Sequence, residues 1–208
     1  MGYDDVCLAI VGLVNLLSLS KTYEFRDDRI VQSNPNPESD ELTQDHNRGL
    51  QRIISGITQT LERDALVQKT TDAARVALEV DRVVLYYFFR KWEGRVTFES
   101  LSSDHFSILG ATGPDQCFNG EYAVMYLDGR VRAITDIESE PIADCHREFL
   151  REIQVQANLV VPILTQRGLW GLLVAHHCQS VRHWHDADIQ LMKAAAQTLS
   201  SAPSIKNS

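Results

Sequence analysis

The sequence contains the apolar stretch Ala157-Asn158-Leu159-Val160-Val161-Pro162-Ile163-Leu164, followed four residues later by Leu169-Trp170-Gly171-Leu172-Leu173-Val174-Ala175-His176-His177. Both stretches are short and apolar, and the polar tip Thr165–Gly168 between them favours an antiparallel hairpin. Side chains of a strand alternate between its two faces, so His176 is predicted to lie on one face and His177 on the other. Leu172, Val174 and Cys178 share the face of His176.

A second hairpin is predicted earlier in the chain. The segment Arg82–Phe89 is rich in β-branched and aromatic residues, which is typical of a strand. Gly94 then turns the chain into a second strand at Arg95–Ser100. A further short strand is predicted at Val131–Ile134, after the turn Asp128-Gly129.

Helical spacing of apolar residues predicts helices before and after these strands. From Arg48 onward one helical face is formed by Leu50, Ile53, Ile54, Ile57 and Leu61. Asp64 is predicted to cap a second helix, and His185 or Asp186 to open a closing one. The order helix, hairpin, irregular middle, hairpin, helix predicts an α+β fold, with a central antiparallel sheet flanked by helices.

The middle of the chain, Leu101–Ile153, shows little regular periodicity. Segments of this length inside a compact domain are usually binding segments or lids. Two of the four cysteines, Cys117 and Cys145, lie there. The middle segment is therefore the part of the chain in which we expect the functional residues.

The composition excludes some functions. The formal net charge is -8 and the isoelectric point is about 5.3, and no basic run occurs, which argues against nucleic acid as a partner. The apolar stretch Val6–Leu17 follows two aspartates and is too short to cross a membrane. Four cysteines without a Cys-X-X-Cys pair predict free thiols in a reducing cytoplasm.

The chain is predicted to have four parts. Residues 1–32 form an N-terminal appendage with a short helix that seeks a protein surface. Residues 33–47, with Pro35, Pro37 and many charges, predict a flexible linker. Residues 48–200 form the main domain and residues 201–208 a polar tail. The start at Met1 and this tail favour a natural short chain.

Two short motifs in the middle segment resemble those of a known family. They are Asp115-Gln116-Cys117-Phe118 and Cys145-His146. Together with the Ala157–His177 hairpin, in this order and spacing, they resemble a cyanobacteriochrome. This is a bilin-binding GAF domain of the phytochrome superfamily, here of the subgroup marked by an Asp-X-Cys-Phe motif. The resemblance covers residues 48–200.

The resemblance implies roles for the two thiols. Cys145 would attach a linear tetrapyrrole permanently, through a thioether to its A-ring side chain, and His146 would pack against this bilin. Cys117 would attack the central methine bridge reversibly and so shorten the conjugated system. A thiol suits both roles because its thiolate is a strong nucleophile that can also leave.

Five further residues match positions in the family that surround the bilin. Asp115 would accept hydrogen bonds from the pyrrole N–H groups. His176 would hydrogen-bond the D-ring, Tyr122 and Tyr126 would stack on or hydrogen-bond it, and Phe118 would pack beneath the chromophore. Read without the resemblance, Asp115 could cap a turn after Pro114, and the others could fill a core.

The function that the resemblance implies is that of a photoreceptor whose cofactor is phycocyanobilin, its isomer phycoviolobilin, or both. Isomerisation of the D-ring between 15Z and 15E would switch the protein between two states. One is linked to the thiol of Cys117 and absorbs violet to blue light, and the other absorbs green to orange light. No enzymatic activity is implied beyond self-catalysed bilin attachment and isomerisation. The partner would be an unidentified signalling protein, with no membrane partner, and self-association into a homodimer is left open.

Three other classes remain open at this point. A zinc site could draw on Cys117, Cys145, His146, His176 or Cys178, although the spacing of an ordinary ligand pair is absent. A GAF domain that senses another small molecule would leave the two thiols unexplained. A cysteine-dependent enzyme would need an acid–base partner that the sequence does not show.

Overall fold

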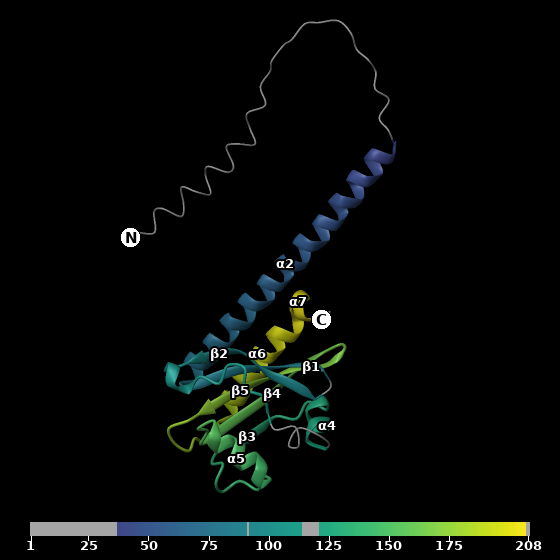
Figure 1. Cartoon of the computed structure of the whole chain (residues 1–208). Coiled ribbons are helices and arrows are strands. Elements are labelled where there is room, and N and C mark those ends of the chain that lie inside the picture. The colour runs from purple at the N-terminus through teal and green to yellow at the C-terminus, as the bar shows by residue number, and fades with distance from the viewer. Residues whose placement is uncertain (1–36, 91, 114–120, 207–208) are drawn as a thin grey trace, which may run out of the picture. The chain divides into compact units, whose positions relative to one another are not determined.

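The computed structural model describes residues 37–90, 92–113 and 121–206 (Figure 1), and their side chains except for those of 37–46 and 121–123. The unit Asn47–Ser208 contains every described strand. Its sheet has five antiparallel strands in the order β2-β1-β5-β4-β3. These are β1 (Arg82–Arg90), β2 (Glu93–Leu101), β3 (Arg132–Ile134), β4 (Ala157–Thr165) and β5 (Gly168–His177).

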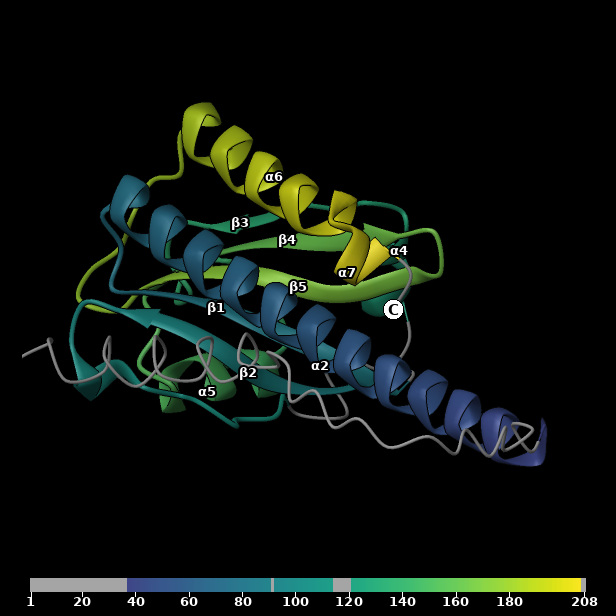
Figure 2. The same cartoon turned by 90° about the horizontal axis from the view of Figure 1, so that it is seen from above.

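Two helices cover one face of the sheet. They are α2 (Pro37–Leu78) and α6 (Asp186–Ser201), which lie over the same face in Figure 2. The core between helices and sheet includes Val67 from α2, Met192 from α6, and Leu85 and Leu173 from the strands. Apolar burial on this face is the main term that stabilises the fold.

The other face of the sheet carries shorter elements. These are the 3₁₀ turn η2 (Asp104–Phe106), α4 (Glu121–Leu127) and α5 (Asp144–Glu152); Figures 1 and 2 place α5 on the side of the sheet away from α2 and α6. The neighbours of Leu85 in β1, Val84 and Tyr86, point to this second face, because strand side chains alternate. The predicted α+β fold with a central antiparallel sheet is confirmed.

The prediction of a linker and two separate helices is wrong in part. Helix α2 runs without a break from Pro37 to Leu78, through Asp64 and through residues 37–47. Proline is well tolerated in the first turn of a helix, where its missing N–H would have no partner. The charged residues that follow Pro37 are compatible with an exposed helix as well as with a linker. Residues 1–36 lie outside the described part of the chain.

Two more predictions need correction. The polar tail contains a short helix, α7 (Pro203–Lys206), and Ile205 within it is fully buried against the core. The middle segment Leu101–Ile153 is less irregular than expected, since η2, α4, β3 and α5 lie within it. Among the described residues no helix is long and apolar enough to cross a membrane.

Candidate functional site

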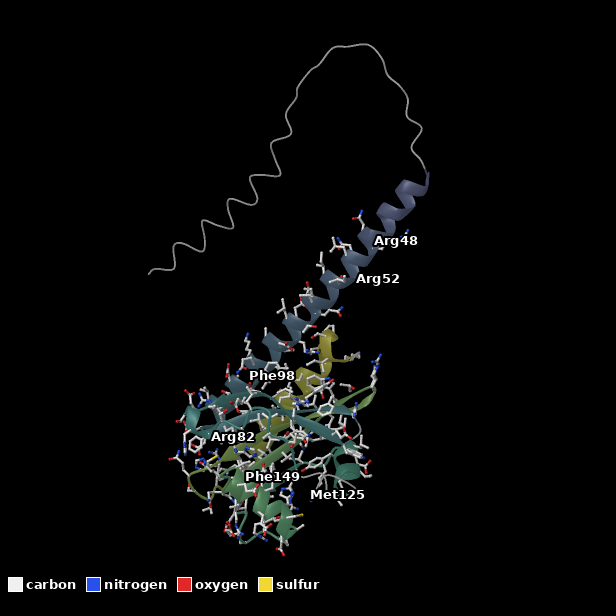
Figure 3. All side chains as sticks on the ribbon, viewed as in Figure 1. Arg48, Arg52, Arg82, Phe98, Met125 and Phe149 are labelled. Atoms are coloured by element: carbon white, nitrogen blue, oxygen red, sulfur yellow. The ribbon has the colours of Figure 1, made fainter. Side chains whose placement is uncertain are left out.

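A largely apolar cavity lies on the second face of the sheet. The space between its walls is about 580 Å³, open solvent at its mouth included. The strands supply its floor, α5 one wall, and the segment Ile108–Gly113 with α4 the remaining side. Figure 3 shows Phe149 of α5 on this side of the sheet. The polar residues of the lining are Tyr86, Tyr126, His146, Asn158 and His176.

Helix α5 turns one face to the cavity. His146, Phe149, Leu150 and Ile153 line it, at the spacing i, i+3, i+4, i+7 that places residues on one side of a helix. Burial, followed by the nearby charge of Arg132, lowers the pKa of His146. The imidazole is therefore neutral at neutral pH and packs as a flat, weakly polar group.

Cys145 lies next to a residue of this wall but is not itself part of the cavity lining. It precedes His146 in the first turn of α5, is not in a disulfide, and is exposed. Its helical position is one turn before Phe149, which lines the cavity. The thiol is therefore accessible to solvent and lies close in the helix to two residues of the cavity wall.

His176 lies on the floor of the cavity, at the end of β5. It is 4 % exposed, and its Nδ1 accepts a hydrogen bond of 3.0 Å from Nε of Arg82. Burial, and then the charge of Arg82, lower the pKa of His176 well below its ordinary value. The prediction that His176 shares a face with Leu172 and Val174 is confirmed, because all three line the cavity.

Asn158 is a cavity residue that the sequence reading did not single out. It pairs with His176 across β4 and β5, is 4 % exposed, and its Oδ1 is buried without a hydrogen-bond partner. A buried amide oxygen without a partner costs free energy, which a ligand N–H could recover. The signal in the sequence is a polar residue near the start of a strand that is otherwise apolar up to its last residue.

Tyr126 projects into the cavity from α4. Burial raises the pKa of its hydroxyl, and the charges of Arg130 and Arg132 lower it by less. The phenol is protonated at neutral pH and can donate a hydrogen bond. Its predicted place beside a ligand is therefore compatible with the structure.

The described residues on both sides of the Asp-X-Cys-Phe motif include residues of the cavity lining. Asp115, Cys117 and Phe118 lie outside the described residues, as does the side chain of Tyr122. Before this segment, Gly113 is buried, lines the cavity, and donates its N–H to the Tyr86 hydroxyl over 3.1 Å. After it, α4 places Tyr126 in the lining. Both flanks of the segment therefore meet the cavity.

Cys178 differs from Cys145 in its surroundings. It is buried, and burial, opposed in part by the charge of Arg82, raises the pKa of its thiol to about 11. A thiol that stays protonated is a poor nucleophile and a poor metal ligand. Within the described residues no three His, Cys, Asp or Glu side chains gather to hold a metal ion.

The fold is that of a GAF domain, and the chain belongs to the GAF domain family, whose model matches residues 62–202. Its solved neighbours are more specific. The blue-light absorbing form of the Thermosynechococcus elongatus PixJ GAF domain is 31% identical, with a TM-score of 0.63, over 69% of this chain and 88% of that one. The phycocyanobilin-bound GAF domain of a cyanobacterial phytochrome is 29% identical, with a TM-score of 0.64, over 76% and 93%.

Two curated relatives are similar to this chain over most of its length. An uncharacterized protein of Picosynechococcus sp. is 51% identical over 73% of this chain and 93% of its own length. A putative methyl-accepting chemotaxis protein of Synechocystis sp. is 36% identical over 68% of this chain, but the match spans only 14% of that protein. The domain is thus of the cyanobacteriochrome and phytochrome type, and similar domains occur within much longer proteins.

Proposed function

We propose that the chain is a photoreceptor that holds a linear tetrapyrrole in the cavity between α5 and the sheet. The observation that carries the proposal is a largely apolar cavity with neutral His146 and buried His176 in its lining, and the exposed thiol of Cys145 next to His146 on the wall helix α5. The partnerless Oδ1 of Asn158 fits this ligand, because a tetrapyrrole brings N–H donors. Solved GAF neighbours that bind phycocyanobilin and biliverdin support the class of cofactor.

In this proposal Cys145 forms the permanent bond. Its sulfur adds to the double bond of the A-ring side chain, and its proton goes to the neighbouring carbon, so that no oxidant or reductant is needed. His146 packs on the tetrapyrrole from the wall of α5. The bound bilin, phycocyanobilin or phycoviolobilin, would supply visible absorption and a D-ring that rotates in light.

Cys117 is proposed as the reversible second thiol. It is four positions after Gly113, and an extended chain advances at most about 3.6 Å per residue. Four such steps span about 14 Å, so the length of the chain allows Cys117 to reach the cavity that Gly113 lines. Its thiolate would donate an electron pair to the methine carbon of a cationic bilin, and Asp115 would stabilise that cation when the thiol has left.

The test is to produce the chain together with bilin biosynthesis enzymes and to record absorption before and after illumination. We expect a coloured protein that switches between a violet-to-blue and a green-to-orange band. A folded but colourless protein would contradict the proposal and would leave a GAF domain that senses another small molecule. Tight zinc binding by the colourless protein would favour the metal-site alternative instead.

A substitution of His176 tests its place beside the D-ring. His176→Ala should keep the covalent bilin, because Cys145 lies on another element, but should change the colour or leave photoconversion incomplete. Absorption spectra with a zinc-stained denaturing gel report both properties. Loss of attachment in a folded His176→Ala protein would contradict this role.

An exposed apolar stripe on α2 supports self-association. Leu50, Ile54, Ile57 and Leu61 follow one another at spacings of four, three and four residues, and they are between 47% and 65% exposed. This repeat is that of a coiled-coil seam, which needs a second helix of the same repeat. Figure 3 shows Arg48 and Arg52 on the outer part of α2, away from the sheet. We infer that a second copy of the chain covers the stripe.

The inference predicts that the chain forms a dimer, and that charged residues introduced into the seam dissociate it. The double variant Ile54→Asp with Ile57→Asp should be a monomer in size-exclusion chromatography with light scattering, with unchanged spectra. Val76→Asp is the matched control, since Val76 is 62% exposed on the same helix but outside the seam. A monomeric wild-type chain would contradict the inference, and dissociation only on deletion of residues 1–36 would assign dimerisation to the N-terminal appendage.

A further inference from the structure

Arg82 is a buried cation whose hydrogen bonds all go to other parts of the fold. It opens β1 and is 1% exposed. Its Nε donates to Nδ1 of His176, and its two terminal amino groups donate to the backbone carbonyls of Phe106 and Ile153. Figure 3 marks its place at the level of the sheet. The guanidinium therefore joins β1, β5, η2 and the end of α5.

The two carbonyl bonds hold the guanidinium plane in place. Phe106 and Ile153 come from elements 47 residues apart in the chain and receive donors from different nitrogens. Because guanidinium donors lie in a rigid fork, fixing two of them also fixes the direction of Nε–H. The donor that meets His176 cannot turn away without breaking contacts to both elements.

The bond from Arg82 determines which nitrogen of His176 carries hydrogen. A guanidinium has donors only, so the nitrogen that it meets must accept. Nδ1 is therefore unprotonated, and a neutral imidazole in this state carries its proton on Nε2. On the side of β5 away from β1, the residue paired with His176 is Asn158 of β4, and Asn158 also lines the cavity.

We propose that Arg82 is a positioning residue that locks His176 as the neutral Nε2–H tautomer, so that the cavity floor offers its ligand a hydrogen-bond donor that does not titrate in the physiological range. For the identity of the ligand the inference rests on the proposed bilin. The tautomer itself is a property of the protein without any ligand. Arg82 acts through His176 and is not in the cavity lining.

The other charged and titratable groups around the pair are consistent with this role. His146 and Tyr126 share the cavity with His176, and both are neutral at neutral pH. Burial lowers the pKa of Arg82, whereas Cys178, Glu99 and Asp81 raise it. An arginine remains charged under such influences. The cationic partner thus opposes a second positive charge on His176 from pH 5 to 8.

The first test is nitrogen NMR of the full chain, without bilin, labelled with ¹⁵N-histidine. The His176 signals, assigned by their loss in His176→Gln, should show an unprotonated Nδ1 and a protonated Nε2 from pH 5 to 8. Protonation of Nδ1, or a transition to imidazolium near pH 6.5, would overturn the proposal whether or not the chain binds bilin. This measurement on the wild-type chain does not depend on the stability of any variant.

The second test compares the pH dependence of the bilin-loaded spectra. Arg82→Gln removes the positive charge, whereas Arg82→Lys keeps the charge but lacks the forked donors of a guanidinium. Arg75→Gln is the control, because Arg75 donates a hydrogen bond to Ser100 between α2 and β2, away from the cavity. Wild type and the control should hold their absorption maxima from pH 5 to 8. Arg82→Gln should gain a reversible spectral shift as the pH falls, because it removes the charge that opposes protonation of His176, and Arg82→Lys should reduce this shift.

The outcomes distinguish the proposed binding of a bilin from the proposed role of Arg82. A wild-type chain that takes up no bilin contradicts the proposed function alone, and the NMR result still decides the tautomer. A loaded Arg82→Gln protein with pH-independent spectra would overturn the role of Arg82. If Arg82→Gln does not fold, Arg82→Lys and the wild-type NMR measurement decide.

Discussion

Cys145→Ala is expected to abolish covalent bilin attachment. The thiol is exposed at the first turn of α5, beside the wall formed by His146 and Phe149, whereas the other described thiol, Cys178, is buried and protonated. Of these two thiols, only that of Cys145 can meet an incoming tetrapyrrole. Zinc-enhanced bilin fluorescence of the denatured protein on a gel, strong in wild type, should fall to background in this variant.

The matched control is Cys178→Ala, which also removes one thiol of the domain. We expect this variant to keep its fluorescent band, with at most a loss of stability from the small cavity left in the core. Retained fluorescence in Cys145→Ala, together with its loss in Cys117→Ala, would reverse the roles of the two thiols. Far-ultraviolet circular dichroism of each variant distinguishes lost attachment from lost folding.

The sheet, and which residues share one of its faces, are predictable from the sequence because strand alternation is strict. Within the Ala157–His177 hairpin, a period of two residues places His176 with Leu172 and Val174 and opposite to Leu173, as found. Most residues of these two strands are buried on both faces, so alternation groups residues by face but does not say which face meets the cavity. The sequence therefore places His176, the residue predicted to meet the D-ring, with Leu172 and Val174, and the structure shows that this group lines the cavity.

What sequence reading misses depends on contacts between distant segments. Arg82 opens a strand, where a charged residue usually faces solvent, and its burial follows from bonds to Phe106 and Ile153. Helix α5 has a single apolar face among charged residues, and its 9 residues are too few for a clear period. The continuity of α2 through residues 37–47 is not evident from the sequence, because charge and prolines suit a linker as well as an exposed helix.

The second prediction with a large effect concerns Cys117→Ser. The variant should keep its bilin, which Cys145 holds, and should still isomerise in light, because the D-ring lies at the far end of the tetrapyrrole from the A-ring bond. It should lose the violet-to-blue state entirely, since a hydroxyl is too weak a nucleophile to attack the methine bridge. Absorption spectra of both illuminated states, with a denaturing gel for attachment, measure these outcomes.

The pH dependence of the rate at which the violet-to-blue state forms is an independent test of the thiol chemistry at Cys117. The thiolate is the attacking species, so the violet-to-blue state should form more slowly as pH falls, whereas D-ring isomerisation itself consumes no proton and should keep its rate. Cys7→Ser, which removes a thiol outside the GAF domain, is the control and should leave both rates unchanged. If Cys117→Ser still switches through the violet-to-blue band, the short-wavelength state does not arise from a bond to Cys117. Its colour must then come from another cause, such as a D-ring twisted out of conjugation against the floor that His176 and Asn158 form.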